Sequence, residues 1–271
     1  MIISYFKILL RLTRINENTI WKTPWVLIHL LIFPLIFVVS PQNFFSYKTI
    51  AVFLGNVFIT ASGFIINDVE DADEDYHVLE KRKRNPISNK ELTKKQGYVI
   101  GFSSMIIGLT LLFTINFLVF LLGFVLGFIG ILYSLKPIKL KSRPILDIVG
   151  HVIGFGVIQI STTYLAFSSP NLQFLSILIV LITFSAAAEI FQELRDFEVD
   201  KKTKINNTIQ KFGKFDPAAL IIVLGMIATL GFGLLFYTIY LDLNIIVFTP
   251  LIFLGTRKYM ECMFTGFNYI K

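Results

Sequence analysis

The residues best suited to chemistry begin directly after a long apolar run, at Asn67. Eight of the 18 Asp and Glu residues fall in 68–91, where Asn67, Asp71 and Asp75 follow at intervals of four and Asp68 lies beside them. On a helix this spacing places the side chains on one face. Carboxylates so close together repel one another, so the pattern needs either a bound cation or a fully solvated face. Because Asn67 and Asp68 continue an apolar run, where ionisable residues are costly, we favour the cation.

A second acidic stretch covers residues 189–200 and holds five more Asp and Glu residues. Gln192, Asp196 and Asp200 again recur at intervals of four, on one helical face. Donor sets made only of oxygen are typical of Mg2+ sites rather than Zn2+ sites. Two facing sets, each holding Mg2+ through one or two direct ligands, would form a clamp for a diphosphate that bridges the ions.

Basic residues follow both acidic stretches. Cytoplasmic loops are basic whatever a protein does, so topology explains many of these residues. We select Arg84, Lys136 and Lys201 as candidates for contacts to the diphosphate oxygens, which Arg can bind bidentately. The three histidines are scattered without a pair at helical ligand spacing, and they predict no histidine metal site.

The composition indicates which elements position these residues. Hydrophobic residues make up 55% of the chain and charged residues only 16%, which is far from a soluble domain. We expect an all-α fold, a polytopic transmembrane helical bundle with cytoplasmic cap loops, forming one domain over residues 1–271. Runs of about 20 apolar residues match the hydrocarbon core of a bilayer. Eight such spans are predicted, at 25–41, 49–67, 97–115, 116–134, 146–167, 172–192, 218–240 and 243–256.

The basic residues also predict how the bundle is oriented. Of the 25 Lys and Arg residues, all except Lys48 fall in the termini and loops that would share one side of the membrane. The positive-inside rule places that side, with both termini and both acidic stretches, in the cytoplasm. Residues 1–16 have an apolar face and a basic face, which is typical of a helix lying at the membrane interface; a frayed terminus is the alternative.

These residues resemble the signatures of a known family, the UbiA superfamily of intramembrane prenyltransferases. The first aspartate signature of the family resembles Asn67-Asp68-x-x-Asp71-x-x-x-Asp75, and the second resembles Asp196-x-x-x-Asp200 followed by Lys201. Two further segments of the family are similar to Arg84-Asn85-Pro86-Ile87-Ser88, where Asn85 separates the usual Arg-Pro pair, and to Tyr133-Ser134-x-Lys136-Pro137. The resemblance extends from about residue 15 to 255. The family has nine spans, so a ninth would fall in the tail 257–271 or be missing.

The resemblance implies a Mg2+-dependent prenyltransferase that moves a prenyl group from a prenyl diphosphate donor to a lipophilic acceptor, such as an aromatic ring or an isoprenoid. It implies an integral protein of a prokaryotic plasma membrane, with membrane lipids and no nucleic acid among its partners. Tyr133 is a candidate contact for the prenyl cation or an ordinary interfacial tyrosine. The catalytic carboxylates implied are Asp68, Asp71, Asp75, Asp196 and Asp200. The metal ligands implied are these five with Asn67 and Gln192.

Two other functions stay open at this point. A polyprenyl-phosphate phosphoribosyltransferase or a terpene cyclase would use the same fold and the same carboxylates. A cation-coupled transporter belongs to another class, and it would place its carboxylates near the middle of the membrane. Here the acids are predicted at helix ends beside basic loops, which favours the binding of a charged headgroup from the cytoplasm.

Overall fold

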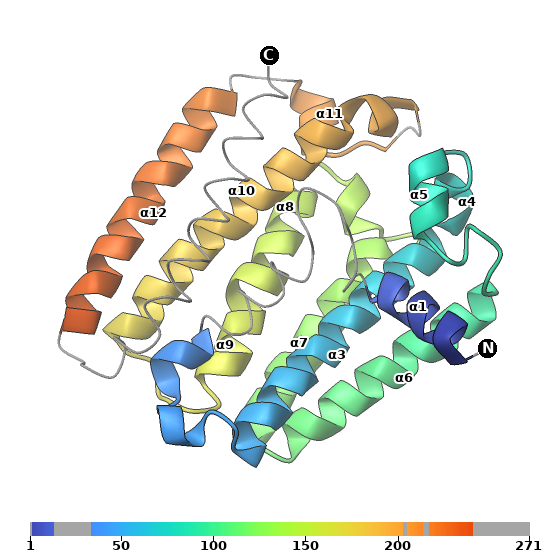
Figure 1. The fold of residues 1–271 in the computed structure, drawn as a ribbon. Helices are drawn as coiled ribbons and strands as arrows, with labels where there is room; N and C mark the ends of the chain where they lie inside the picture. The colour runs from blue at the N-terminus through green and yellow to red at the C-terminus, as the bar shows by residue number, and fades with distance from the viewer. Residues whose placement is uncertain (1, 14–33, 203–204, 214–216, 241–271) are drawn as a thin grey trace.

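The computed structural model describes residues 2–13, 34–202, 205–213 and 217–240, and within them every regular element is a helix (Figure 1). Within these described ranges, five segments are long and apolar enough to cross a membrane. They are α3 (Tyr47–Glu70), α6 (Lys94–Phe113), α7 (Phe117–Ser134), the segment Leu146–Tyr164, and α10 (Leu172–Lys202). The segment Leu146–Tyr164 consists of α8 (Leu146–His151), the π-helix η3 (Val152–Ile158) and α9 (Gln159–Tyr164). A further apolar helix, α12, covers Pro217–Tyr240.

Shorter helices complete the described chain. A first helix, α1, covers Ile2–Leu12. The others are η1 (Pro41–Asn43), α4 (Ala72–Asp75), α5 (Leu79–Arg84), η2 (Leu140–Ser142) and α11 (Thr208–Phe212). Helices α3, α7 and α10 end at the same end of the bundle, where α6, α8 and α12 begin and where α4, α5 and α11 lie (Figure 1). We call this the capped end, and both acidic stretches belong to it.

The predicted spans 49–67, 97–115, 116–134, 146–167 and 218–240 each correspond to helical segments whose bounds differ by a few residues. The span predicted at 172–192 lies in a helix that continues to Lys202. The helix extends further than predicted because it keeps a buried face after the apolar run ends, as at Glu193 and Asp200. Of the span 25–41, only residues from 34 onward are described, and 34–38 are helical. The span 243–256 and the tail 257–271 lie outside the described residues, so the number of spans stays a prediction.

Glycines let the first long helices pack closely. A Cβ atom on Gly108 of α6 would lie 2.7 Å from the carbonyl oxygen of Gly55 on α3. Gly130 of α7 faces the Cα of Gly63, so α3 is in close contact with both neighbours. Gly123, Gly127 and Gly130 have the spacing of small residues in close helix pairs, and they allow α7 to pack closely against its neighbours. This packing fixes the end of α3 beside the start of α6 and the end of α7.

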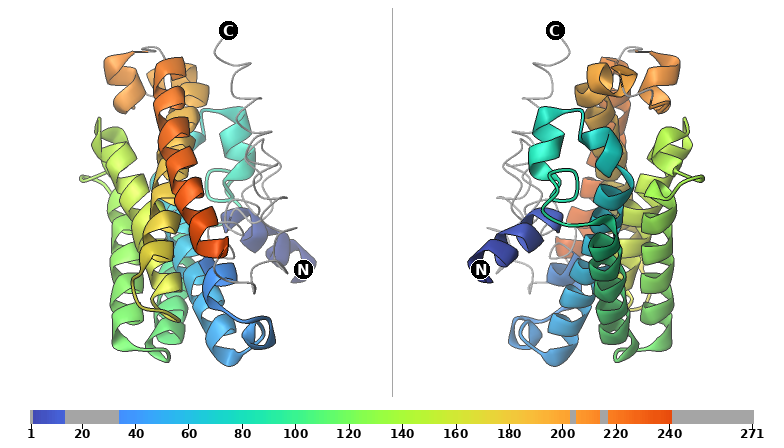
Figure 2. Two further views of the ribbon diagram at one scale, coloured as in Figure 1. Left: turned by 90° about the vertical axis from the view of Figure 1, so that its left-hand side faces the viewer. Right: turned by 90° about the vertical axis from the view of Figure 1, so that its right-hand side faces the viewer.

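Helix α1 lies against the outside of the bundle, at a large angle to the long helices (Figure 2). Its Ile8 and Leu12 are buried in a cluster with residues of α3 and of the segment that follows α5. Beside this cluster, Arg11 pairs with Glu91. The helix predicted within 1–16 is thus present from Ile2 to Leu12, with an apolar face toward the protein.

Candidate active site

The first acidic set forms where α3 leaves the bundle. The helix ends at Glu70, Asp71 follows it as the capping residue, and α4 carries Asp75. A single helix therefore does not run through all of the predicted face, although the amide of Asp75 still donates to the carbonyl of Asp71 at 2.8 Å. Asp68 is fully buried, and Asn67 donates a 2.8 Å hydrogen bond to Ser134 Oγ at the end of α7.

Arg84, the last residue of α5, and Asn85, which follows it, hold two of these carboxylates. The amide nitrogen of Asn85 donates to Asp75 Oδ2 at 3.0 Å and to the backbone carbonyl of Asp68 at 2.7 Å. Its side-chain oxygen accepts from the backbone amide of Ile87 at 2.9 Å. The guanidinium of Arg84 lies 3.8 Å from both Asp68 and Asp75. Asn85, the residue between Arg84 and Pro86, is itself fully buried. Its side chain therefore lies at the centre of the hydrogen bonds in this segment.

Lysines from the loop after α7 neutralise the outer part of the set. Lys141 donates a hydrogen bond to Asp71, and the ammonium of Lys139 lies 3.7 Å from Asp71 and 2.7 Å from Glu74. Lys139 has a φ of 39°, a left-handed backbone that non-glycine residues adopt at a cost. Lys136, a predicted diphosphate contact, pairs instead with Glu74 at 3.4 Å and is half exposed. The loop thus places three lysines around the first acidic set.

The second acidic set lies near the end of α10. Asp196 accepts two hydrogen bonds from Arg195, at 2.8 and 2.9 Å. Asp200 is buried and accepts a 3.0 Å hydrogen bond from Asn207, which also caps α11. Gln192 and Lys201, both predicted as site residues, are exposed, and their side chains make no hydrogen bond or ion pair within the part of the chain that the structure describes.

Basic residues bring the two acidic sets together. Lys81 of α5 lies 3.9 Å from Asp200. The charges of Lys81 and Arg84 also interact with Asp196. From the other side, Lys141, which binds Asp71, interacts electrostatically with Asp200 as well. Arg84 and Lys141 therefore interact with both sets, and Lys81 interacts with the second. We call these three residues the basic centre.

The donors fit Mg2+ by their chemistry. Both sets offer carboxylate and amide oxygens, which are the ligands that Mg2+ prefers. Among the described residues, no three acids or histidines converge closely enough to form a ready-made metal cage. A preformed cage is not required, because Mg2+ is usually held by one or two carboxylates together with water and substrate phosphates.

A second group of polar side chains lies deeper in the bundle. Tyr133 donates a 2.5 Å hydrogen bond to Glu189, and His151 Nε2 lies 3.6 Å from the other oxygen of Glu189. Tyr133 was predicted as a contact for the prenyl group, whereas Glu189 and His151 were not selected. Glu189 was one of five acids in its stretch, and only the fold tells which of them face inward.

Two acids at the edge of the capped end form ion pairs outside the two acidic sets. A hydrogen bond from Lys94 is the main cause that lowers the pKa of Asp73. Burial raises the pKa of Glu91, but hydrogen bonds from Arg11 and Asn89 outweigh burial and lower it overall. These acids are therefore paired apart from the basic centre.

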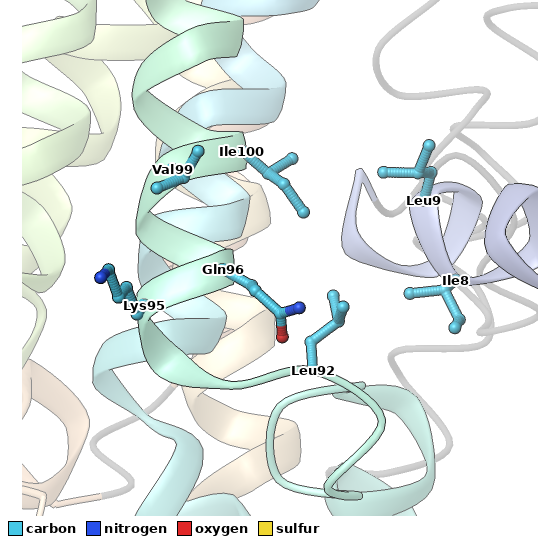
Figure 3. Close-up of a pocket in the computed structure, with 7 residues that line it drawn as sticks. All are labelled: Ile8, Leu9, Leu92, Lys95, Gln96, Val99 and Ile100. Carbon is cyan, nitrogen blue, oxygen red and sulfur yellow. The ribbon is translucent and has the colours of Figure 1, made fainter.

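The structure has an apolar pocket of 330 Å³ between α1 and the start of α6, shown in Figure 3. It is lined by Ile8, Leu9, Leu92, Lys95, Gln96, Val99 and Ile100. No member of either acidic set lines this pocket, so we do not assign it to the site.

Together the long apolar helices, the two acidic sets and the basic centre define an integral membrane protein with a polar site at one end of its bundle. The model of the UbiA prenyltransferase family matches residues 25–264, and the chain belongs to this family. No curated protein matches the sequence significantly.

Solved structures of UbiA homologues share the fold. A homologue from Archaeoglobus fulgidus bound to GPP and Mg2+ is 22% identical, with a TM-score of 0.69, over 95% of this chain and 86% of that one. The same homologue bound to DMAPP and Mg2+ is 21% identical, with a TM-score of 0.68, over 94% and 86%. A structure of digeranylgeranylglyceryl phosphate synthase is 20% identical, with a TM-score of 0.64, over 98% of this chain and 95% of that one.

Proposed function

We propose that this protein is a Mg2+-dependent prenyltransferase that moves the prenyl group of a prenyl diphosphate onto a lipophilic acceptor. The basic centre carries the proposal, because Arg84 and Lys141 each interact with carboxylates of both acidic sets. A diphosphate needs cations on both sides, and the space between two carboxylate sets can supply them. The neighbours bound to GPP or DMAPP with Mg2+ support a donor of this class.

The residues divide into two proposed metal sites. Asn67, Asp68, Asp71 and Asp75 would hold Mg2+ on one side, and Asp196 and Asp200 would hold it on the other, with Gln192 as an outer member. When bound, Mg2+ would draw electron density from the diphosphate and so ease its departure as a leaving group.

The basic centre would then bind the diphosphate. Arg84, Lys81 and Lys141 now neutralise carboxylates, and a bound metal would take over that role. Their donors could turn to the phosphate oxygens, where Arg can bind bidentately. Lys136 and Lys201, being exposed, would contact the headgroup only at its outer edge. An interior that keeps water scarce would let the acceptor reach the prenyl cation before water does.

We further propose that the capped end faces the cytoplasm of a prokaryotic cell, with both termini on that side. The distribution of Lys and Arg supports this orientation, since Lys48 alone falls in an opposite loop. Membrane lipids would surround the bundle, and the prenyl chain would enter from the cytoplasmic border. A transporter is a weaker explanation, because both acidic sets lie at helix ends.

The test uses purified protein in detergent with geranyl diphosphate as donor. The acceptors are para-hydroxybenzoate as a phenolic ring, geranylgeraniol as a lipid alcohol and squalene as an alkene. Diphosphate release and prenylated products are followed by mass spectrometry, with and without Mg2+. We expect transfer to one acceptor class, and only with Mg2+. A cyclised donor without transfer would identify a terpene cyclase instead.

Two substitutions test the site in the same assay. Asp71→Ala and Asp196→Ala should each reduce turnover by at least about a hundredfold, since losing one metal contact removes several kcal/mol of transition-state stabilisation. Asp73→Ala is the matched control, because Asp73 is exposed and pairs with Lys94. Size-exclusion profiles should be unchanged. Activity of Asp71→Ala or Asp196→Ala within a few-fold of wild type would refute the assignment.

A further inference from the structure

Prenyl transfer leaves a proton to be disposed of, and the metal-binding carboxylates do not account for it. When the acceptor attacks, its electron pair forms a bond to C1 of the prenyl group. The C1–O bond breaks, and its electron pair leaves with diphosphate. The acceptor carbon or oxygen then carries one proton too many. A base must lie beside C1, deeper in the bundle than the diphosphate.

Glu189 occupies such a position. It lies two helical turns before Asp196 on α10, which corresponds to about 10 Å along the helix axis. Residues seven apart share a face, so Glu189 faces the same interior as Asp196. Its side chain is only 5% exposed. A buried carboxylate at this depth is costly, which marks it as a functional candidate.

Side chains from two other helices, α7 and α8, contact this carboxylate of α10. From α7, Tyr133 donates to one oxygen of Glu189 at 2.5 Å. Its neighbour Ser134 accepts the hydrogen bond from Asn67, so the same end of α7 contacts both the first acidic set and Glu189. From α8, His151 Nε2 lies 3.6 Å from the second oxygen, and its Nδ1 lies 3.0 Å from Ser185 Oγ.

The other acids nearby are engaged elsewhere. Glu193, one turn further on α10, accepts the backbone amide of Ile209 at 2.9 Å. Asp147 of α8 accepts the amide of Thr208 at 2.5 Å together with the hydroxyl of that residue. Both acids thus hold the segment around α11 in place. Among the described residues, the carboxylate of Glu189 contacts only the side chains of Tyr133 and His151, and both of these can exchange a proton.

Aromatic rings line the same region. The ring of His151 lies 4.9 Å from that of Phe155, and Phe155 stacks on Phe64 of α3 at 6.2 Å. Such faces attract a cation. The side chain of His151 is 19% exposed, against 5% for Glu189, so a proton on His151 is closer to solvent.

We propose that Glu189 accepts the proton that the acceptor loses during prenyl transfer. Tyr133 and His151 are positioning residues: Tyr133 fixes one carboxylate oxygen, and His151 receives the proton from the other and passes it to water. The inference rests on the proposed function and adds the base that this function needs.

The test compares product formation with diphosphate release in Glu189→Gln, using geranyl diphosphate, Mg2+ and the same three acceptors. Without the base, the cation still forms but is captured by water. We expect product to fall by about a hundredfold or more, in the range for loss of a general base. Diphosphate release should fall by less than about tenfold, so the ratio of diphosphate to product should rise at least about tenfold.

Two further variants keep the result interpretable. Glu198→Gln makes the same chemical change on an exposed residue of the same helix, and it should leave the ratio unchanged. His151→Gln should raise the ratio even if Glu189→Gln does not fold. A purely structural role would lower product and diphosphate release together, and an unchanged ratio in both site variants overturns the proposal. If the wild type transfers no prenyl group to any acceptor, the proposed function fails first and this inference fails with it.

Discussion

At the scale of single residues, the cost of burying charge explains the detail of the first acidic set. Asp68 is fully buried and Asp75 is nearly so. A buried carboxylate is tolerated only when it is paired and hydrogen-bonded. Arg84 supplies the charge to both, and Asn85 donates to the carboxylate of Asp75 and to the backbone carbonyl of Asp68. In the sequence, Asn85 was only a departure from the Arg-Pro pattern of the family, because nothing local indicates what an amide side chain will contact.

The first prediction concerns Asn85. Asn85→Ala should leave Asp75 without an amide donor and the amide of Ile87 without an acceptor. The expected loss of stability is about 1–3 kcal/mol, with a higher Mg2+ concentration needed for half-maximal diphosphate release. Thermal unfolding in detergent and a Mg2+ titration measure the two effects.

Asn89→Ala is the control for this prediction, since Asn89 is exposed and its side chain, within the described residues, bonds to the exposed Glu91 nearby. If Asn85→Ala melts and binds Mg2+ like Asn89→Ala, the central role of Asn85 is wrong.

At the scale of elements, hydropathy predicts the helices well but not where they end. Apolar runs indicate the membrane core, and six of the predicted spans coincide with described helical segments. The end of α10 was missed by ten residues, because its last three turns are polar and carry no hydropathy signal. The break at Asp71 between α3 and α4 was also missed, since residues 67–75 fit one continuous helical face. Helix ends depend on tertiary contacts such as the one between Asp200 and Asn207.

The second prediction tests the close packing of α3 and α6. Gly108→Ala places a Cβ atom 2.7 Å from the backbone oxygen of Gly55, which cannot rotate away. The two helices must separate, at a cost of about 1–3 kcal/mol typical of overpacking. Because α3 ends in the first acidic set, diphosphate release should fall with the melting temperature.

Gly233→Ala is the matched control on α12, where a Cβ atom meets nothing within 4 Å. This substitution should stabilise the protein by up to about 1 kcal/mol, since alanine favours the helix. A melting temperature for Gly108→Ala equal to that of Gly233→Ala would contradict the packing described for α3 and α6.

At the scale of the whole molecule, the bundle brings together residues more than a hundred positions apart. The alternation of spans and the basic loops predict that both acidic stretches lie at one end. They do not predict the contact of Lys81 with Asp200, since no local pattern encodes a distance between separate helices. For the same reason, the sequence does not indicate that Lys139 and Lys141, rather than Lys136, lie beside Asp71. The proposed common site therefore depends on the fold, whereas the chemistry proposed for it comes from the residue types in the sequence.

The most direct measurement of a common site is pyrophosphate binding in the presence of Mg2+, by calorimetry, to Asp71→Asn, Asp196→Asn and the double variant. If both acidic sets hold one pyrophosphate group, each single substitution weakens binding by at least about tenfold, or about 1.4 kcal/mol. The double substitution should then cost little more than the worse single one, because either change already disrupts the clamp. Losses that simply add, or affinity within about twofold of wild type for either single variant, would show that the two sets do not share a ligand.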